Sequence, residues 1–249
     1  LEIEREIKSL SQKQAFSQVW EERGELEQLL QDHSLKIMVA GNIGFGKTTV
    51  TGIIGVFGKI KEINEPVDNP VLQLYYGNMK AYSERLQLDL INVRLNDVVF
   101  HCLQNPSRSI AFDRTHYEDT YIFCEVLTKA DLMTLEEKKF CHWYFDMKLH
   151  QLEKRYGVGL IPDLIIFLKG DIETGWKRVQ GRERTMEVRE DAGKGVGLSR
   201  EFYQALHDEY EIFHRRLLDG ELYEGAVITL SQDTEEVADA TNTKGQIYV

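Results

Sequence analysis

The sequence predicts an α/β domain with a mostly parallel sheet, preceded by a helical extension. From residue 35 onward, short β-rich runs alternate with amphipathic segments, which is typical of βαβ units whose sheet is covered on both faces. The run 164–168 is apolar without alternation, as expected of a strand buried on both sides. Residues 1–33 differ, because they are rich in Glu, Gln, Lys and Leu and contain no proline.

The positions of the runs define the expected elements. Strands are predicted at 37–40, 60–63, 109–112, 164–168 and 226–230. Helices are predicted near 47–57, 81–103, 116–130, 134–155, 172–186 and 199–218. Because we find no repeat, low-complexity tract or linker after residue 35, we divide the chain into an extension, 1–34, and one domain, 35–249.

The extension carries apolar residues at helical spacing in three groups that are out of register with one another. These groups are Ile3, Ile7 and Leu10, then Phe16, Val19 and Trp20, then Leu26, Leu29 and Leu30. The slips disfavour a continuous coiled coil and favour one or two amphipathic helices. Such helices either pack on their own domain or make an oligomer contact, and the sequence leaves both readings open.

The charge balance narrows the range of partners. The chain has 249 residues, with 30 Lys and Arg against 41 Asp and Glu, a net charge of −11. Nucleic-acid affinity depends mostly on basic residues that neutralise phosphates, so we expect no nucleic-acid partner. A small phosphorylated ligand needs only a few local positive groups and remains compatible. No apolar run is long enough to span a bilayer, so we expect no membrane association.

The cysteines point to a reducing compartment. Cys102, Cys124 and Cys141 are an odd number without CxxC spacing, which predicts buried thiols rather than a disulfide framework or a zinc site. We expect a cytoplasmic location, although the sequence leaves open a removed organelle-targeting peptide.

Residues 41–48 read Gly-Asn-Ile-Gly-Phe-Gly-Lys-Thr and fit the phosphate-loop pattern G-x-x-x-x-G-K-[ST] between a predicted strand and a predicted helix. Glycines let the loop curl so that its N–H groups face phosphate oxygens. Lys47 can reach the β- and γ-phosphates, and the Thr48 hydroxyl can bind Mg²⁺. The expected ATP contacts from this segment are Gly41, Asn42, Ile43, Gly44, Phe45, Gly46, Lys47, Thr48 and Thr49.

Two carboxylates and an arginine follow neighbouring predicted strands, at the edge where open α/β sheets bind ligands. Glu65 precedes a proline and can take a proton from an attacking hydroxyl. Asp113 can bind Mg²⁺ or its waters, and Arg114 can hold a phosphate or an acceptor hydroxyl. Thr115 and Glu118 form a capping-box pattern that predicts a helix starting near residue 116. Taken alone, Glu65 also fits an exposed loop residue.

Two helix faces combine polar and aromatic side chains. Gln87 and Arg94 share one face, and Asp119 and Phe123 share another at i,i+4 spacing. Gln and Asp can read the edge of a base, and Phe can stack on it. Ordinary amphipathic polarity is the alternative for each residue alone.

Three arginines, Arg178, Arg182 and Arg184, lie within seven residues of an acidic chain. We expect them to form an anion-binding lid over the transferred phosphate, spanning about 176–198, with Arg178 and Arg182 on one helix face. A solvated charged face is the alternative.

Together these segments resemble the deoxynucleoside kinase family, with the closest likeness to bacterial deoxyadenosine/deoxyguanosine kinases. The motifs keep their order and spacing from about residue 36 to 230. Besides the phosphate loop they are Glu65-Pro66-Val67, Asp68-Asn69-Pro70-Val71-Leu72, Tyr75-Tyr76, Leu86-Gln87 through Arg94, Asp113-Arg114-Thr115-His116-Tyr117-Glu118-Asp119, and Arg178 to Glu187.

The resemblance implies a P-loop nucleotide-kinase fold with a five-stranded parallel sheet, and a homodimer or higher homo-oligomer. It implies transfer of the γ-phosphate of ATP–Mg²⁺ to the 5′-hydroxyl of a deoxynucleoside, with a purine favoured. It also implies individual roles. Glu65 is then the general base, Arg114 steadies the 5′-oxygen and the phosphates, and Asp113 serves Mg²⁺ with Thr48. Base recognition is assigned to Gln87, Arg94 and Asp119 with Phe123 beside them, recognition of the 3′-hydroxyl to Tyr76 and Glu187, and the lid to Arg178, Arg182 and Arg184.

Two other functions compete with this reading. A nucleoside monophosphate kinase of thymidylate-kinase type needs an extra basic group for the acceptor phosphate, and the segment 188–198, which looks like an insertion, carries Arg189 and Lys194. A catalytically idle nucleotide-binding scaffold is expected to have lost catalytic residues, yet Lys47, Thr48, Glu65, Asp113 and Arg114 are present. A GTPase is disfavoured because the chain has no NKxD motif.

Overall fold

The computed structural model describes residue 30, residues 33–64, 69–181 and 198–231, and the backbone of 241–242 and 246–247. These parts of the chain contain a five-stranded parallel sheet in the order β2-β3-β1-β4-β5 and a small antiparallel pair, β6-β7. The strands are β1 (Lys36–Gly41), β2 (Lys61–Ile63), β3 (Ile110–Asp113), β4 (Leu164–Lys169), β5 (Ala226–Ser231), β6 (Thr241–Asn242) and β7 (Gln246–Ile247). The helices are α2 (Lys47–Gly58), α3 (Pro70–Gly77), α4 (Met79–Gln104), the π-helix η1 (Asp119–Phe123), α5 (Cys124–Lys129), α6 (Leu135–Tyr156), α7 (Ile172–Gln180) and α8 (Arg200–Leu218).

The predicted fold class is confirmed. Each of the five predicted strands is present and parallel, with its ends within one residue of the prediction. Since successive residues of a strand point to opposite faces, β1 sends Met38 to one core cluster and Val39 to the other.

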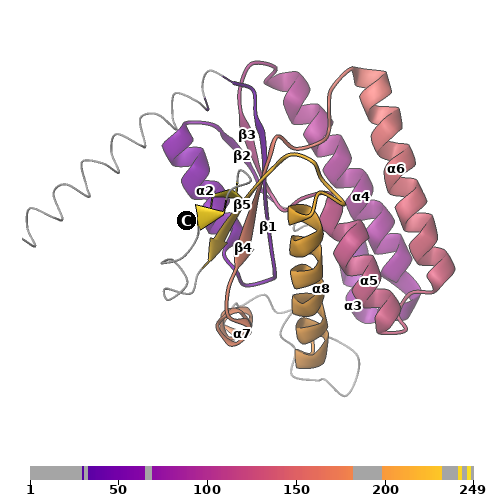
Figure 1. Ribbon diagram of the computed structural model, residues 1–249. Helices are drawn as coiled ribbons and strands as arrows, with labels where there is room; N and C mark the ends of the chain where they lie inside the picture. Colours follow the sequence, from indigo (N-terminus) through magenta and orange to yellow (C-terminus); the bar gives the residue numbers. More distant parts are fainter. Residues whose placement is uncertain are drawn as a thin grey trace, which may run out of the picture.

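Helices cover both faces of the sheet. Figure 1 shows α2 on one side and α4, α5, α6 and α8 on the other, which agrees with the two apolar clusters. The larger cluster joins strand residues such as Phe112 and Phe167 to these outer helices, and the smaller one joins Leu168 to α2. The strand ends that carry the predicted site residues are therefore held by packing on both sides.

One helix prediction is wrong in extent, and one helix was not predicted. The segment 172–186 was expected to be one helix, but α7 ends at Gln180 and the N–H of Gly181 caps its last turn. Glycine has low helix propensity and commonly stops helices. The prediction that Arg178 and Arg182 share one helix face lies partly outside the described residues, because Arg182 is not among them. The helix α3 was not predicted, although Asn69 accepts a hydrogen bond from the Val71 N–H and a proline fills its first turn.

The segment 116–130 is helical, but its first part winds more loosely than predicted. Over η1 the backbone bonds step from residue i to i+5, as between the Cys124 N–H and the Asp119 carbonyl. Asp119 and Phe123 therefore do not align as they would at α-helical i,i+4 spacing.

One residue of the predicted extension lies in the described chain. Leu30 is buried at 3% exposure in the cluster under α2, and its carbonyl accepts a hydrogen bond from the Ser109 hydroxyl at 2.7 Å. The end of the extension thus packs on the domain, whereas the predictions for 1–29 and for 188–197 lie outside the described residues.

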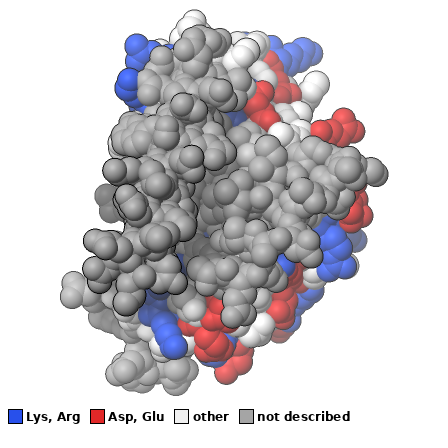
Figure 2. Space-filling model, turned by 60° about the vertical axis from the view of Figure 1, so that its left-hand side comes forward, with Lys and Arg blue, Asp and Glu red and all other residues white. Residues whose placement is uncertain are grey.

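Charges of both signs are mixed on the surface. On the described part of the face in Figure 2, Lys and Arg side chains lie among Asp and Glu side chains. No helix within the described ranges is long and apolar enough to cross a membrane. All three cysteines are described and are free thiols, with Cys124 and Cys141 buried and Cys102 half-buried.

Candidate active site

The phosphate loop follows β1 directly and ends where α2 begins. Gly44 and Gly46 have positive φ angles of 87° and 80°, which residues other than glycine rarely adopt. A Cβ on Gly44 would also lie 2.5 Å from the carbonyl oxygen of Gly175 in α7. The loop can therefore curl tightly only because these positions are glycine.

Lys47 folds back over this loop. Its side chain is only 7% exposed, and its Nζ donates to the carbonyl oxygens of Gly41 at 2.6 Å and Asn42 at 3.1 Å. The ammonium charge thus lies within the loop that would surround the phosphates of a nucleotide. Arg178 of α7 reaches the same loop, since its Nη1 donates to the Gly44 carbonyl at 3.4 Å.

The two predicted metal-binding side chains meet. The Thr48 hydroxyl donates to Asp113 Oδ2 at 2.6 Å, although the two residues are 65 positions apart. The register of the parallel strands β1 and β3 explains this contact. Asp113 at the end of β3 pairs with Val39 of β1, two residues before the loop.

These residues fit a magnesium ion that also binds phosphates. Asp113 Oδ1 is buried without a hydrogen-bond partner among the described residues, so it is available to a cation or its waters. Mg²⁺ commonly takes one or two protein ligands, and phosphates and waters supply the rest. Within the described part of the chain, no group of three or more His, Cys, Asp or Glu residues could hold a metal without a substrate.

Arg114 occupies an unusual turn directly after β3. Its φ is +83°, and its N–H donates to the Val39 carbonyl at 3.0 Å, which ties the turn to β1. Its guanidinium donates to the Tyr210 hydroxyl at 3.1 Å and lies 5.1 Å from the centre of the Phe123 ring. A strained backbone held by specific contacts is common at functional sites.

Arg94 and Asp119 form a buried ion pair. Arg94 Nε lies 2.6 Å from Asp119 Oδ2, with side-chain exposures of 7% and 1%. Burial raises the pKa of the Asp119 carboxyl, and the charges of Arg94 and Arg114 oppose that rise. Gln87 is buried on the same helix as Arg94, and its Oε1 lacks a hydrogen-bond partner in the described chain. Of the predicted base-reading residues, Arg94 and Asp119 are thus paired, and Gln87 is buried two helical turns before Arg94 on α4.

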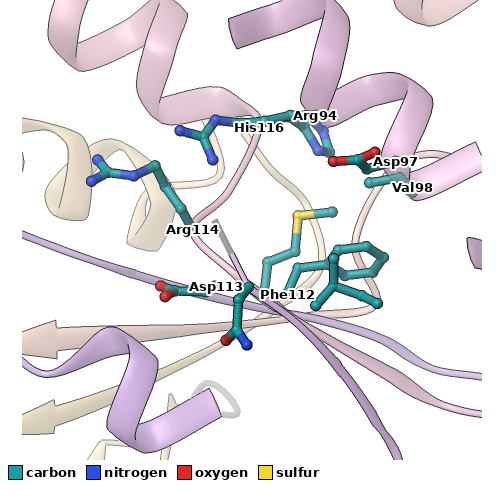
Figure 3. Close-up of a pocket in the computed structure, with 10 residues that line it drawn as sticks. Arg94, Asp97, Val98, Phe112, Asp113, Arg114 and His116 are labelled. Carbon is teal, nitrogen blue, oxygen red and sulfur yellow. The ribbon is translucent and has the colours of Figure 1, made fainter. Parts of the chain in front are cut away.

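A pocket opens between α4 and the carboxyl ends of β2 and β3. Figure 3 shows Arg94, Asp97 and Val98 on α4 facing Phe112 and Asp113 at the end of β3. The remaining lining residues are Met38, Ile63, Asn64, Arg114 and His116. The pocket thus adjoins the phosphate loop through Asp113 and the buried ion pair through Arg94.

His116 and Asp97 are polar lining residues that sequence reasoning did not single out. Both ring nitrogens of His116 are buried without a hydrogen-bond partner in the described chain. Burial, assisted by the charge of Arg94, lowers the pKa of His116 to about 3, so the ring is neutral at neutral pH. The one signal in the sequence that could have predicted its place in the pocket is its position two residues after Arg114.

The other predicted residues divide into two groups. Tyr76 is half-buried on α3 and packs edge-to-face on Tyr75 with ring centres 5.4 Å apart, and Thr49 is exposed in the first turn of α2. Four predicted residues lie outside the described residues: Glu65, Arg182, Arg184 and Glu187.

A glycine-rich phosphate loop on a five-stranded parallel sheet, with an acidic residue bonded to its threonine, defines the fold as that of the P-loop kinases. Residues 37–248 match the deoxynucleoside kinase family. The chain belongs to this family and is an enzyme that phosphorylates deoxynucleosides.

Known relatives agree with this assignment. A deoxyadenosine kinase of Lactobacillus acidophilus is 30% identical, with 74% of this chain and 85% of the relative covered. A deoxyguanosine kinase of the same organism is 28% identical, with coverages of 76% and 82%. A deoxyadenosine kinase structure from M. mycoides with bound dCTP superposes with a TM-score of 0.59 over 81% of this chain and 93% of that one, at 23% identity, and supports the fold.

Proposed function

We propose that this enzyme transfers the γ-phosphate of ATP–Mg²⁺ to the 5′-hydroxyl of a purine deoxynucleoside. The observation that carries the proposal is the junction at Asp113 and Arg114. Asp113 bonds to Thr48 at the phosphate loop, and both Asp113 and Arg114 line the pocket. Donor and acceptor sites that share two adjacent residues can bring the γ-phosphate and a hydroxyl together.

On the donor side, the loop amides and Lys47 bind the phosphates, and Arg178 adds positive charge next to Gly44. Thr48 and Asp113 would hold Mg²⁺, which would supply positive charge against the developing charge of the phosphates. We assign Arg182 and Arg184 to the lid on the family pattern.

On the acceptor side, Glu65 follows directly on Asn64, which lines the pocket, and we assign it as the base that accepts the proton of the 5′-hydroxyl. An alcohol is a weak nucleophile at neutral pH, so removal of this proton assists its attack. Arg114 stabilises the negative charge of the attacking oxygen and of the transferred phosphate. Tyr76 and Glu187 are assigned to the 3′-hydroxyl on the family pattern.

The base is read by the buried cluster of Arg94, Asp119 and Gln87, with Phe123 beside it. A charged pair and an amide offer both donors and acceptors, which suits a purine edge. The names of the relatives, deoxyadenosine and deoxyguanosine kinases among them, support a purine substrate.

Replacing the base tests this mechanism. Glu65→Gln is expected to lower kcat by about 10² to 10⁴ with little change in nucleoside binding, because only the proton acceptor is removed. Retention of the wild-type kcat would reject the assignment of Glu65.

We further propose that the enzyme is a homodimer located in the cytoplasm. The outer helices α4 and α6 expose Phe100 and Trp143, which are 52% and 57% accessible, and a second copy could cover them. Light scattering of the wild type and of Trp143→Glu tests the dimer. We expect the variant to have a smaller mass than the wild type, and equal masses would contradict a dimer contact at Trp143. Deleting residues 1–29, which spares the buried Leu30, tests whether the extension adds to the assembly, and an unchanged mass would exclude that role.

The three free thiols support the proposed cytoplasmic location, because free thiols persist in a reducing compartment.

A further inference from the structure

We infer that Tyr210 and Glu118 are positioning residues that hold the guanidinium of Arg114, so that helix α8 helps to set the geometry of phosphoryl transfer. The inference rests on the proposed function, which places Arg114 at the reacting oxygens.

A chain of buried hydrogen bonds connects the three side chains. The Tyr210 hydroxyl accepts from Arg114 Nη1 at 3.1 Å and donates to Glu118 Oε1 at 2.7 Å. The same carboxylate oxygen lies 3.9 Å from Arg114 Nη1. Tyr210 is 2% exposed, Glu118 0% and Arg114 8%, so water hardly competes for these contacts.

Glu118 is itself fixed in place. Its Oε2 accepts from the Thr115 N–H at 2.6 Å and from the Thr115 hydroxyl at 3.2 Å. Its Oε1 accepts from the Gly41 N–H at 3.5 Å, in addition to its bond with Tyr210. The capping residue predicted from the sequence therefore also connects the start of the phosphate loop with the turn that carries Arg114.

Arg114 needs such partners. A buried guanidinium loses hydration and is stabilised by a carboxylate and hydrogen-bond acceptors nearby. A long side chain at a turn with φ of +83° also has several rotamers available. Glu118 compensates the charge, and Tyr210 and Glu118 together restrict the guanidinium to one position before substrate binds. That is the condition for electrostatic stabilisation without reorganisation.

The same helix also contacts the donor side. Tyr203, two helical turns before Tyr210, donates its hydroxyl to the Ile43 carbonyl of the phosphate loop at 2.7 Å. Residues at i and i+7 lie on one helix face. One face of α8 thus contacts the loop that binds phosphates and the arginine that contacts the acceptor.

The test removes one hydroxyl and leaves the ring in place. Tyr210→Phe is expected to lower kcat about 10-fold, because a guanidinium that is no longer fixed samples unproductive positions. KM for the nucleoside is expected to stay within about twofold, since base recognition is assigned to the Arg94 cluster. The matched control is Tyr223→Phe, which removes another buried hydroxyl, bonded to the Pro162 carbonyl at 2.9 Å, and is expected to keep the wild-type kcat.

A double-variant comparison separates positioning from general destabilisation. If Tyr210 acts through Arg114, Tyr210→Phe lowers kcat in the wild-type background but adds no further loss to Arg114→Gln. An unchanged kcat in Tyr210→Phe, or a full additional loss in the Arg114→Gln background, would overturn the inference. The role of Arg114 is tested separately, because an Arg114→Gln enzyme with wild-type kcat would instead reject the proposed function of that residue.

Discussion

The buried side chain of His116, which lines the pocket, makes the folding stability of the protein sensitive to acid. Its imidazole is buried and stacks on Phe145 with ring centres 5.7 Å apart. Burial and the charge of Arg94 lower its pKa to about 3, against 6.5 in an unfolded chain. As the pH falls below about 6.5, the unfolded chain binds a proton at this residue and the folded chain does not, so folding stability decreases.

The magnitude follows from the two pKa values. At about 1.4 kcal/mol per pH unit, lowering the pH from 7 to 5 removes about 2 kcal/mol from the free energy of unfolding at this one residue. Asp119 acts in the opposite direction, because burial raises the pKa of its carboxyl in the folded state. A variant of His116 alone isolates the histidine, since the carboxyl contributes in both proteins.

His116→Phe keeps a ring stacked on Phe145 and cannot bind a proton. Urea unfolding at pH 7 and pH 5, followed by circular dichroism and tryptophan fluorescence, gives the loss of stability for each protein. We expect the loss to be about 2 kcal/mol smaller in the variant than in the wild type. Equal losses in the two proteins would refute the burial of a neutral histidine.

Three further predictions concern the polar cluster, the metal site and the phosphate loop. Arg94→Met leaves the Asp119 carboxylate buried without its partner, so urea unfolding is expected to show a loss of about 3–5 kcal/mol in the free energy of unfolding. The order of preference among nucleosides is also expected to change. A uniform drop in the rates for all nucleosides would contradict base reading by Arg94. Asp113→Asn is expected to raise the Mg²⁺ concentration needed for half-maximal rate several-fold in a metal titration, and an unchanged requirement would exclude the carboxylate as a ligand. Gly175→Ala places a methyl group against the Tyr203 hydroxyl and the Phe45 ring. Because Tyr203 bonds to the phosphate loop at the Ile43 carbonyl and Phe45 is part of that loop, calorimetry is expected to show weaker ATP binding without loss of nucleoside binding. ATP binding as tight as in the wild type would contradict this packing.

The sheet was predictable because its signals are local. Each strand reads as a short apolar run between turn residues, and the phosphate-loop glycines mark the junction of β1 and α2. The C-terminal end of α7 and the winding of η1 were not predictable in the same way, because helical periodicity continued past Gly181 and through Asp119 in the sequence. The helix α3 had a local signal, a proline after Asn69, that periodicity alone did not detect.

The site was predictable in its residues more than in its contacts. The motif spacing placed Thr48 and Asp113 at one sheet edge, where they form a hydrogen bond. The network around Arg114 depends on Tyr210, which is 96 residues away, and no local pattern reports a side-chain contact over that separation. The buried imidazole of His116, which has no hydrogen-bond partner among the described residues, is likewise visible only when the surrounding helices are in place.

The most direct test of the account is ATP- and Mg²⁺-dependent phosphorylation of deoxynucleosides, ribonucleosides and deoxynucleoside monophosphates, with Glu65→Gln as the control. We predict turnover of a purine deoxynucleoside that is lost in the variant. Turnover of monophosphates alone would contradict the account in favour of a nucleoside monophosphate kinase, and ATP binding without turnover of any acceptor would contradict it in favour of a catalytically idle scaffold.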